Sequence, residues 1–142
     1  MTDKDQLAKD VFDKMMETDY CSQWMGIKAI EVKECSCKLS MIVKKDMLNG
    51  FGILHGGIAY AFADSAFAFA SNSLGRLSVS INGSMSFHKS AKEGDKIIAV
   101  ASPIHVGNKT ADFNVNISND QEELMYSFKG TVYRTSRSVL EK

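Results

Sequence analysis

The sequence predicts an α+β fold in which an antiparallel β-sheet wraps around one long, buried α-helix. Residues 57–74 are almost all apolar or small, and a helix that is apolar on every side belongs in the core of a soluble protein. Six segments with the residue pattern of strands flank this helix, two before it and four after. The chain has 142 residues, which suits one domain covering residues 1–142.

The part of the chain before the central helix is expected to hold one further helix and two strands. Residues 5–19 place apolar side chains at helical spacing: Leu7, Val11, Phe12, Met15 and Met16. Residues 26–32 and 35–43 alternate as half-buried strands do, with a turn at Lys33 and Glu34. Residues 44–56 are rich in Asn and Gly and predict an irregular loop.

The part after the central helix is expected to be all strand. Gly75 is expected to end the helix. Strands are predicted at residues 77–88, 96–106, 111–118 and 123–135, with turns at 93–95, 107–108 and 119–120. Pro103, the only proline, indicates a sheet edge or a bulge. A single curled sheet leaves part of the helix uncovered, so a second copy of the chain is expected to bury it in a dimer.

The composition gives no support for a nucleic acid or a membrane as partner and no sign of a secreted protein. The 17 basic and 17 acidic residues balance, so bulk charge supports neither a nucleic acid nor a membrane as partner. Three cysteines without a disulfide framework fit a reducing, cytoplasmic environment, and the polar first residues give no sign of a signal peptide. The Cys35-x-Cys37 pair lacks a second pair or a nearby His. We therefore expect no metal.

Asp64 stands out in the central helix. No Lys or Arg occurs between His55 and Gly75, so the helix itself offers Asp64 no cationic partner. A buried, unpaired carboxylate costs free energy, and such groups are retained mainly where they take part in chemistry. We predict that Asp64 is the catalytic carboxylate. The alternatives are pairing with an arginine elsewhere in the fold and exposure at an interface.

The residues that open the helix add to this prediction. His55, Gly56 and Gly57 stand where the helix begins. The first turn of a helix has unpaired N–H groups, and glycine lets a ligand approach them closely. Such a turn can hold an oxyanion formed when a carbonyl is attacked. Asn49, in the loop before, can donate a hydrogen bond to a carbonyl or orient a water. The structural alternatives are a plain glycine turn, a histidine that fixes the loop, and a turn asparagine.

These motifs together resemble the PaaI-type hotdog thioesterases. The pattern N-G-x-G-x-x-H-G-G runs from Asn49 to Gly57, and Asp64 follows seven residues after the last glycine. The segment from Ala63 to Ala68 is similar to the central helix of that family. The resemblance implies a hotdog fold, in which an antiparallel β-sheet wraps around a long central α-helix. It also implies hydrolysis of acyl-CoA thioesters, with phenylacetyl and hydroxyphenylacetyl groups as the name-giving substrates.

The resemblance also implies roles for individual residues. Asp64 matches the acidic residue that acts as general base or nucleophile. Gly57 matches the backbone donor to the thioester carbonyl, with His55 and Asn49 beside it. Ser80, on the next strand, falls where related enzymes carry a serine that orients the water. The family forms its site between two chains, so a homodimer is the expected minimum and a homotetramer the expected assembly.

The substrate contacts are expected around the same loop and helix. Gly56, Phe51 and Ser65 match positions beside the substrate, and Lys89 and Lys109 are the candidates for the CoA phosphates, because a strongly anionic ligand needs a basic rim. CoA is part of the substrate, and no cofactor is expected.

The acyl preference is predicted from aromatic residues. Tyr60, Phe62, Phe67 and Phe69 alternate with small residues on the helix; flat rings that face a ligand favour an aryl-acetyl or a short acyl group over a long chain. Two alternatives remain open: a non-catalytic domain that binds acyl-CoA, and a hotdog hydratase or dehydratase that uses His55.

Overall fold

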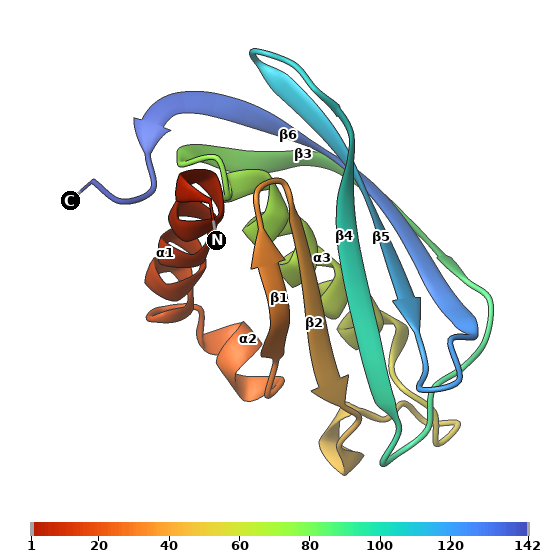
Figure 1. The fold of residues 1–142 in the computed structure, drawn as a ribbon. Helices are drawn as coiled ribbons and strands as arrows, with labels where there is room; N and C mark the ends of the chain where they lie inside the picture. Colours follow the sequence, from red (N-terminus) through yellow and green to blue (C-terminus); the bar gives the residue numbers. More distant parts are fainter. Residues whose placement is uncertain (1, 142) are drawn as a thin grey trace.

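The computed structural model describes residues 2–141 and has the predicted α+β architecture (Figure 1). In chain order the elements are α1 (Asp3–Met16), α2 (Tyr20–Trp24), β1 (Lys28–Lys33), β2 (Ser36–Ile42), η1 (Lys45–Met47), α3 (Gly56–Asn72), β3 (Arg76–Phe87), β4 (Lys96–Val106), β5 (Thr110–Ser118) and β6 (Leu124–Ser138). Seven of these differ from their predicted bounds by at most three residues at either end, and β4 has the predicted bounds. The short elements α2 and η1 were not predicted.

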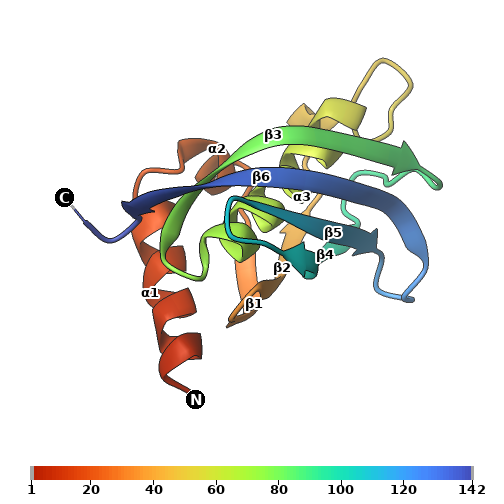
Figure 2. The ribbon, with the colours of Figure 1, turned by 90° about the horizontal axis from the view of Figure 1, so that it is seen from above.

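The six strands form one antiparallel sheet in the order β1-β2-β4-β5-β6-β3. The sheet curls so that α3 lies on its concave side, as the views in Figures 1 and 2 agree. Helix α1 packs on β1 and on α3. It therefore covers part of the central helix that the sheet leaves open.

The core is built around α3. The rings of Phe62, Phe67 and Phe69 are at most 1% exposed. Phe67 contacts Phe128 from β6 with a centroid separation of 5.3 Å, and Phe69 contacts Phe12 from α1 at 4.6 Å. Burying such a ring contributes about 1.5–3 kcal/mol. These three phenylalanines are core residues.

The N-terminal segment differs most from the prediction. Helix α1 starts at Asp3 because Thr2 Oγ1 accepts a hydrogen bond from the Asp5 N–H at 3.0 Å. It ends at Met16. Asp19 then caps a new helix, α2, of five residues. A helix this short has no apolar periodicity to reveal it.

Pro103 has both features that its presence predicts. Strand β2 pairs with β4 only as far as Ala101, so Pro103 lies where β4 has no neighbour on that side. The register between β4 and β5 also shifts between Pro103 and His105, which marks a bulge.

Strand β3 forms one edge of the sheet. This strand of 12 residues has β6 as its only neighbour in the sheet. Val79 is 47% and Ile81 58% exposed on this strand. A long edge strand presents unpaired backbone groups to another chain, so β3 is a surface on which a second copy can add.

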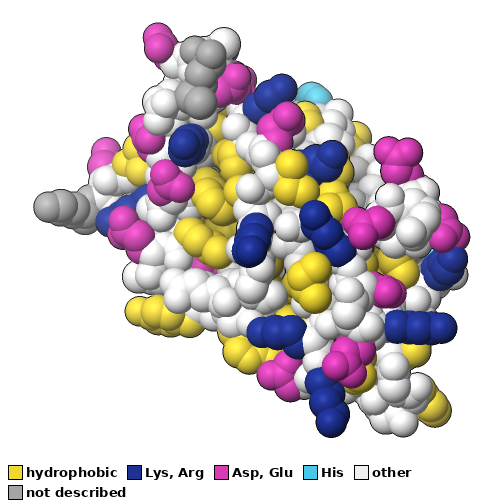
Figure 3. Space-filling view, turned by 60° about the horizontal axis from the view of Figure 1, so that its bottom comes forward, with side chains coloured by type: hydrophobic (Ala, Val, Ile, Leu, Met, Phe, Trp, Pro, Cys, Tyr) yellow, Lys and Arg dark blue, Asp and Glu magenta, His cyan; other side chains and the backbone are white. Residues whose placement is uncertain are grey.

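The surface of the molecule carries both signs of charge. Figure 3 turns the lower end of Figure 1 toward the viewer, and basic and acidic side chains are interspersed there with exposed hydrophobic ones. This mixture agrees with the zero net charge. Among the described residues, none of the helices has both the length and the apolar character needed to cross a bilayer.

Candidate active site

Asp64 lies in the middle of α3, half-buried, and forms no salt bridge with a described residue. Burial raises the pKa of this carboxyl above its usual range, and the negative charge of Asp19 raises it further. A carboxylate that holds its proton more tightly is a stronger base. The arginine partner that would make Asp64 a structural residue is not found among residues 2–141.

Asp64 shares one face of α3 with the start of the helix. Gly57, Ala61, Asp64 and Ala68 follow one another at helical spacing, and each retains some exposure to solvent. The neighbouring Ala63 and Ala66 are fully buried. The open stripe is therefore the part of α3 that neither the sheet nor the N-terminal helices cover.

The start of α3 is capped by His55. Its Nδ1 accepts a hydrogen bond from the Gly57 N–H at 2.9 Å, and its carbonyl accepts from the N–H groups of Ile58 and Ala59. The Gly57 N–H is thus already bonded to a protein group. The Gly56 N–H has no acceptor among the described residues, so it is the donor that the first turn leaves free for a ligand.

Asn49 organises the loop before the helix and retains a free donor. Its Oδ1 accepts hydrogen bonds from the N–H groups of Phe51 (2.9 Å) and Ile53 (3.4 Å), and its backbone also bonds Ile53 and Gly52. The structural role that the sequence suggested for Asn49 is therefore present. Its Nδ2 has no acceptor among the described residues, so the amide can still donate to a substrate carbonyl or to a water.

A cavity of about 260 Å³ lies at the start of α3. Its lining residues are Asn49, Ile53, Leu54, Gly56, Phe87, His88, Lys89, Ser90 and Tyr126. The rings of Phe87 and Tyr126 meet edge to face, 5.8 Å apart. A Cβ atom on residue 56 would lie 3.1 Å from Phe87 Cε2. The glycine therefore allows this ring to pack against the helix start.

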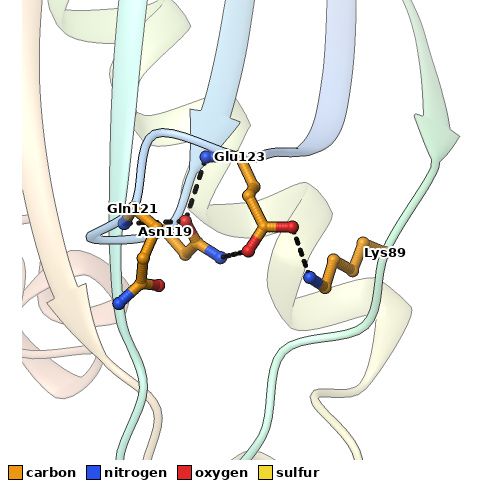
Figure 4. A network of polar contacts seen from close by, with 4 residues as sticks. All are labelled: Lys89, Asn119, Gln121 and Glu123. Carbon is orange, nitrogen blue, oxygen red and sulfur yellow. Dashed lines mark hydrogen bonds and ion pairs between the residues drawn. The ribbon is translucent and has the colours of Figure 1, made fainter.

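Lys89 is held at the edge of this cavity by an anchored carboxylate (Figure 4). Its Nζ lies 2.5 Å from Glu123 Oε2. Glu123 Oε1 in turn accepts a hydrogen bond from Asn119 Nδ2 at 3.0 Å, and Asn119 Oδ1 accepts from the N–H groups of Gln121 and Glu123. The lysine and Asn119 lower the pKa of the Glu123 carboxyl. The charge of Lys89 is thus already paired with that of Glu123.

The other predicted residues lie elsewhere in the chain. Lys109 is exposed in the turn between β4 and β5, whereas Lys89 lies in the connection between β3 and β4, so the two residues flank opposite ends of β4, which Figure 1 shows. Strand β4, with 11 residues, spans about 35 Å between these ends. Phe51 is 90% exposed at the loop tip, Ser80 is exposed on the edge strand β3, and Ser65 is buried with its hydroxyl 2.8 Å from Ser22 Oγ.

Asp64 and the cavity at the helix start are separate within one chain. Asp64 lies eight residues beyond Gly56 on the same helix, which is a distance of about 12 Å along the axis. Reacting atoms must come within about 3–3.5 Å. The carboxylate of one chain therefore cannot act on a carbonyl bound at the Gly56 N–H of that same chain.

The side chains that commonly bind metals are not clustered in the described part of the chain. Within residues 2–141, no three His, Cys, Asp or Glu side chains are grouped as a metal site requires. Cys37 is buried, and burial raises the pKa of its thiol to about 12. The Cys35-x-Cys37 pair therefore offers no ready thiolate ligand.

Comparison with known proteins identifies the family of the chain. The family model described as Thioesterase superfamily matches residues 51–126, which contain the helix start, Asp64 and most of the sheet. A relative from Archaeoglobus fulgidus is 40% identical over 133 residues, which cover 94% of this chain and 86% of that protein. Acyl-coenzyme A thioesterase PaaI of Escherichia coli is 33% identical over 125 residues, which cover 88% of this chain and 89% of that protein.

Solved structures show the same relationship. The structure of the E. coli PaaI protein from the phenylacetic acid degradation operon superimposes with a TM-score of 0.92 at 31% identity, covering 94% of this chain and 97% of that one. A mutant PaaI from Thermus thermophilus gives 0.79 at 31% identity, covering 82% of this chain and all of that one. The chain therefore belongs to the Thioesterase superfamily, and it is a thioester hydrolase with the PaaI-type hotdog fold.

Proposed function

We propose that this chain hydrolyses acyl-CoA thioesters to a free acid and CoA, with Asp64 as the general base or the nucleophile. The observation that carries the proposal is the half-buried Asp64, which has no cationic partner among the described residues and lies on the helix that starts with a free backbone donor. The E. coli relative that is 33% identical over 125 residues is an acyl-coenzyme A thioesterase, which supports CoA as the carrier of the acyl group.

The chemistry follows from these groups. The thioester carbonyl oxygen accepts the Gly56 N–H, and the partial positive charge of the helix start favours the oxyanion that forms there. As general base, Asp64 removes a proton from a water whose oxygen bonds to the carbonyl carbon. Collapse of the oxyanion breaks the C–S bond, and CoA leaves as a thiolate that takes up a proton. As nucleophile, an Asp64 carboxylate oxygen bonds to that carbon, the C–S bond breaks and CoA leaves as the thiolate, and water then hydrolyses the resulting anhydride to the free acid and Asp64.

The proposed site takes residues from two chains. Gly57 and Asp64 lie on the same open stripe of α3, about 10 Å apart. A twofold axis that crosses α3 between Gly57 and Asp64 places the helix start of one chain opposite Asp64 of the other. In such a symmetric contact the same pairing occurs twice, so the dimer has two equivalent sites. The unpaired edge of β3 and its exposed Val79 and Ile81 support such a dimer. A homotetramer would then be a pair of these dimers.

Phosphate binding is proposed for Lys89, which lines the cavity that contains Gly56. Lys109 is too distant to share a ligand with Lys89 in the same chain. The hydratase alternative relied on His55, and His55 Nδ1 is bonded to the Gly57 N–H instead. No observation favours that alternative.

The acyl preference proposed here is for arylacetyl or short acyl groups. Phe87 and Tyr126 give the small cavity aromatic walls. We expect kcat/KM for phenylacetyl-CoA to exceed that for palmitoyl-CoA at least tenfold, which requires only about 1.4 kcal/mol in transition-state binding. An equal or higher value for palmitoyl-CoA contradicts this preference and leaves thioester hydrolysis intact.

The test is release of free thiol from a panel of acyl-CoA thioesters, read with a thiol reagent. Asp64→Asn is expected to lower kcat by at least about 100-fold, while binding of a non-hydrolysable CoA thioether persists. Asp13→Asn, on the exposed side of α1, is the matched control and should retain the wild-type rate. An Asp64→Asn protein with wild-type turnover rules the assignment out. Binding without thiol release by the wild type indicates a non-catalytic acyl-CoA-binding domain.

A further inference from the structure

A buried chain of hydrogen bonds joins α2 to α3 beside Asp64. The Asp19 carboxylate accepts hydrogen bonds from the Ser22 N–H at 2.9 Å and from Ser22 Oγ at 2.7 Å. Ser22 Oγ lies 2.8 Å from Ser65 Oγ. Ser22 is 0% and Ser65 9% exposed. Two serine hydroxyls therefore meet inside the protein at the residue that follows Asp64 in the sequence.

The direction of these hydrogen bonds follows from the groups themselves. An ionised carboxylate can only accept, so the hydroxyl hydrogen of Ser22 points to Asp19. Ser65 must then donate its own hydrogen to Ser22 Oγ. The chain runs from Ser65 through Ser22 to Asp19, and it places a negative charge at its end. A helix of five residues does not need a link into α3 merely to satisfy its own N-terminus.

The charge of Asp19 has no counterion among the described residues, and it acts on Asp64. The pKa of Asp64 is raised by burial and then by Asp19. Helix α3 packs against α1 and against β2 to β6, and among the described residues Asp19 is the charged group that raises the pKa of this carboxyl. Tyr60, one helical turn before Asp64, brings a phenol rather than a permanent charge.

We propose that α2 is part of the active site: Ser65 and Ser22 fix Asp19 as a second carboxylate beside Asp64, and Asp19 is a positioning residue that acts on the reaction through Asp64. The proposal rests on the proposed function of Asp64. A neighbouring negative charge favours the protonated form of Asp64, so Asp64 accepts the proton of the attacking water more readily. Ser65 then serves the site by holding α2 rather than by contacting the substrate.

The first test is the pH dependence of kcat/KM in Asp19→Asn. Asparagine caps a helix as well as aspartate does, so the variant loses the charge and keeps the turn. The acidic limb of its profile is expected at lower pH than in the wild type, with a lower kcat/KM above the limb because Asp64 is then a weaker base. Asp13→Asn removes a charge from the same end of the chain and should leave the limb in place. Asp19→Glu, which retains the charge, should keep the wild-type limb.

A purely structural role for Asp19 predicts a different result. The rate would then fall by the same factor at every pH while the limb stays where it is, and this outcome overturns the proposal. Asp19→Ser, which also caps a helix without a charge, takes the place of Asp19→Asn if that variant does not fold.

The second test does not depend on activity. NMR titration of ¹³C-labelled aspartate carboxyls identifies the Asp64 signal by its absence in Asp64→Asn. In Asp19→Asn this signal is expected to titrate at lower pH than in the wild type, and an unchanged midpoint refutes the coupling. A shifted midpoint in a protein that hydrolyses no thioester instead refutes the proposed function and leaves the coupling between the two carboxylates standing.

Discussion

Mixing two inactive variants tests whether the site takes residues from two chains. Asp64→Asn removes the carboxylate, and Asn49→Asp removes the free amide donor while its Oδ1 still accepts from the N–H groups of Phe51 and Ile53. Asp64 lies about 12 Å along α3 from Gly56, so in the proposed dimer each site takes Asp64 from one chain and Asn49 with the helix start from the other. A mixed dimer then has one site with both defects and one with neither.

The expected recovery is a matter of counting. If equal amounts of the two variants assort at random, half of the dimers are mixed and half of their sites are intact, so activity returns to about one quarter of the wild-type value. The two variants are co-expressed with different tags, and the mixed dimer is purified by using both tags in turn. Its rate of thiol release should reach about one half of the wild-type value. If the verified mixed dimer is no more active than the average of its parents, each site is contained within one chain, and the two-chain geometry is wrong.

The remaining predictions concern single positions. Burial raises the pKa of the folded Asp64 carboxyl above its ordinary value of 3.8, so at a pH above both pKa values the ionised carboxylate destabilises the folded state. Asp64→Asn should therefore raise the Tm at pH 7. Calorimetry should show that this gain in Tm becomes smaller as the pH falls toward 3.8. Glu123→Gln frees Lys89 from its ion pair and should lower KM for acyl-CoA about twofold or more with kcat unchanged; an unchanged KM argues against Lys89 as a phosphate contact. Gly83→Ala would place a Cβ 2.4 Å from the Tyr60 hydroxyl oxygen and should cost about 1–3 kcal/mol in urea unfolding, and Tyr60→Phe in the same chain should recover part of that loss.

Much of the fold could be predicted because its signals are local. Alternating residues mark each of the six strands, and the apolar run of α3 marks a core helix. The strand order could not be predicted in this way. Strand β3 follows α3 directly, yet it pairs with the last strand, β6, and this pairing depends on contacts between residues far apart in the sequence. Helix α2 was also not predicted, because it is defined by its cap at Asp19 rather than by a repeating pattern of apolar residues.

The candidate site was only partly predictable for the same reason. Asp64 is conspicuous because its helix carries no other charge, and the glycines are conspicuous because they stand where that helix begins. Residue types alone did not predict the hydrogen bond from the Gly57 N–H to His55 Nδ1. Because of this bond, the free backbone N–H at the helix start belongs to Gly56 and not to Gly57. The sequence left open which aromatic residues of α3 line a pocket and which pack in the core, because side-chain direction is not visible in the sequence.

The structure of α3 explains why a helix that looks buried on every side can also carry a site. Successive residues point about 100° apart, so Ala63, Asp64 and Ser65 face three different surroundings. Ala63 is buried in the core, Ser65 bonds to α2, and Asp64 lies on the open stripe. Small side chains along that stripe allow a second chain to approach closely without competing with the carboxylate for space. The apolar and small residues of α3 thus form two surfaces: one packs in the core of the chain, and the other forms the proposed contact between two chains. Asp64 lies on the second surface, where the proposed dimer would bring the substrate.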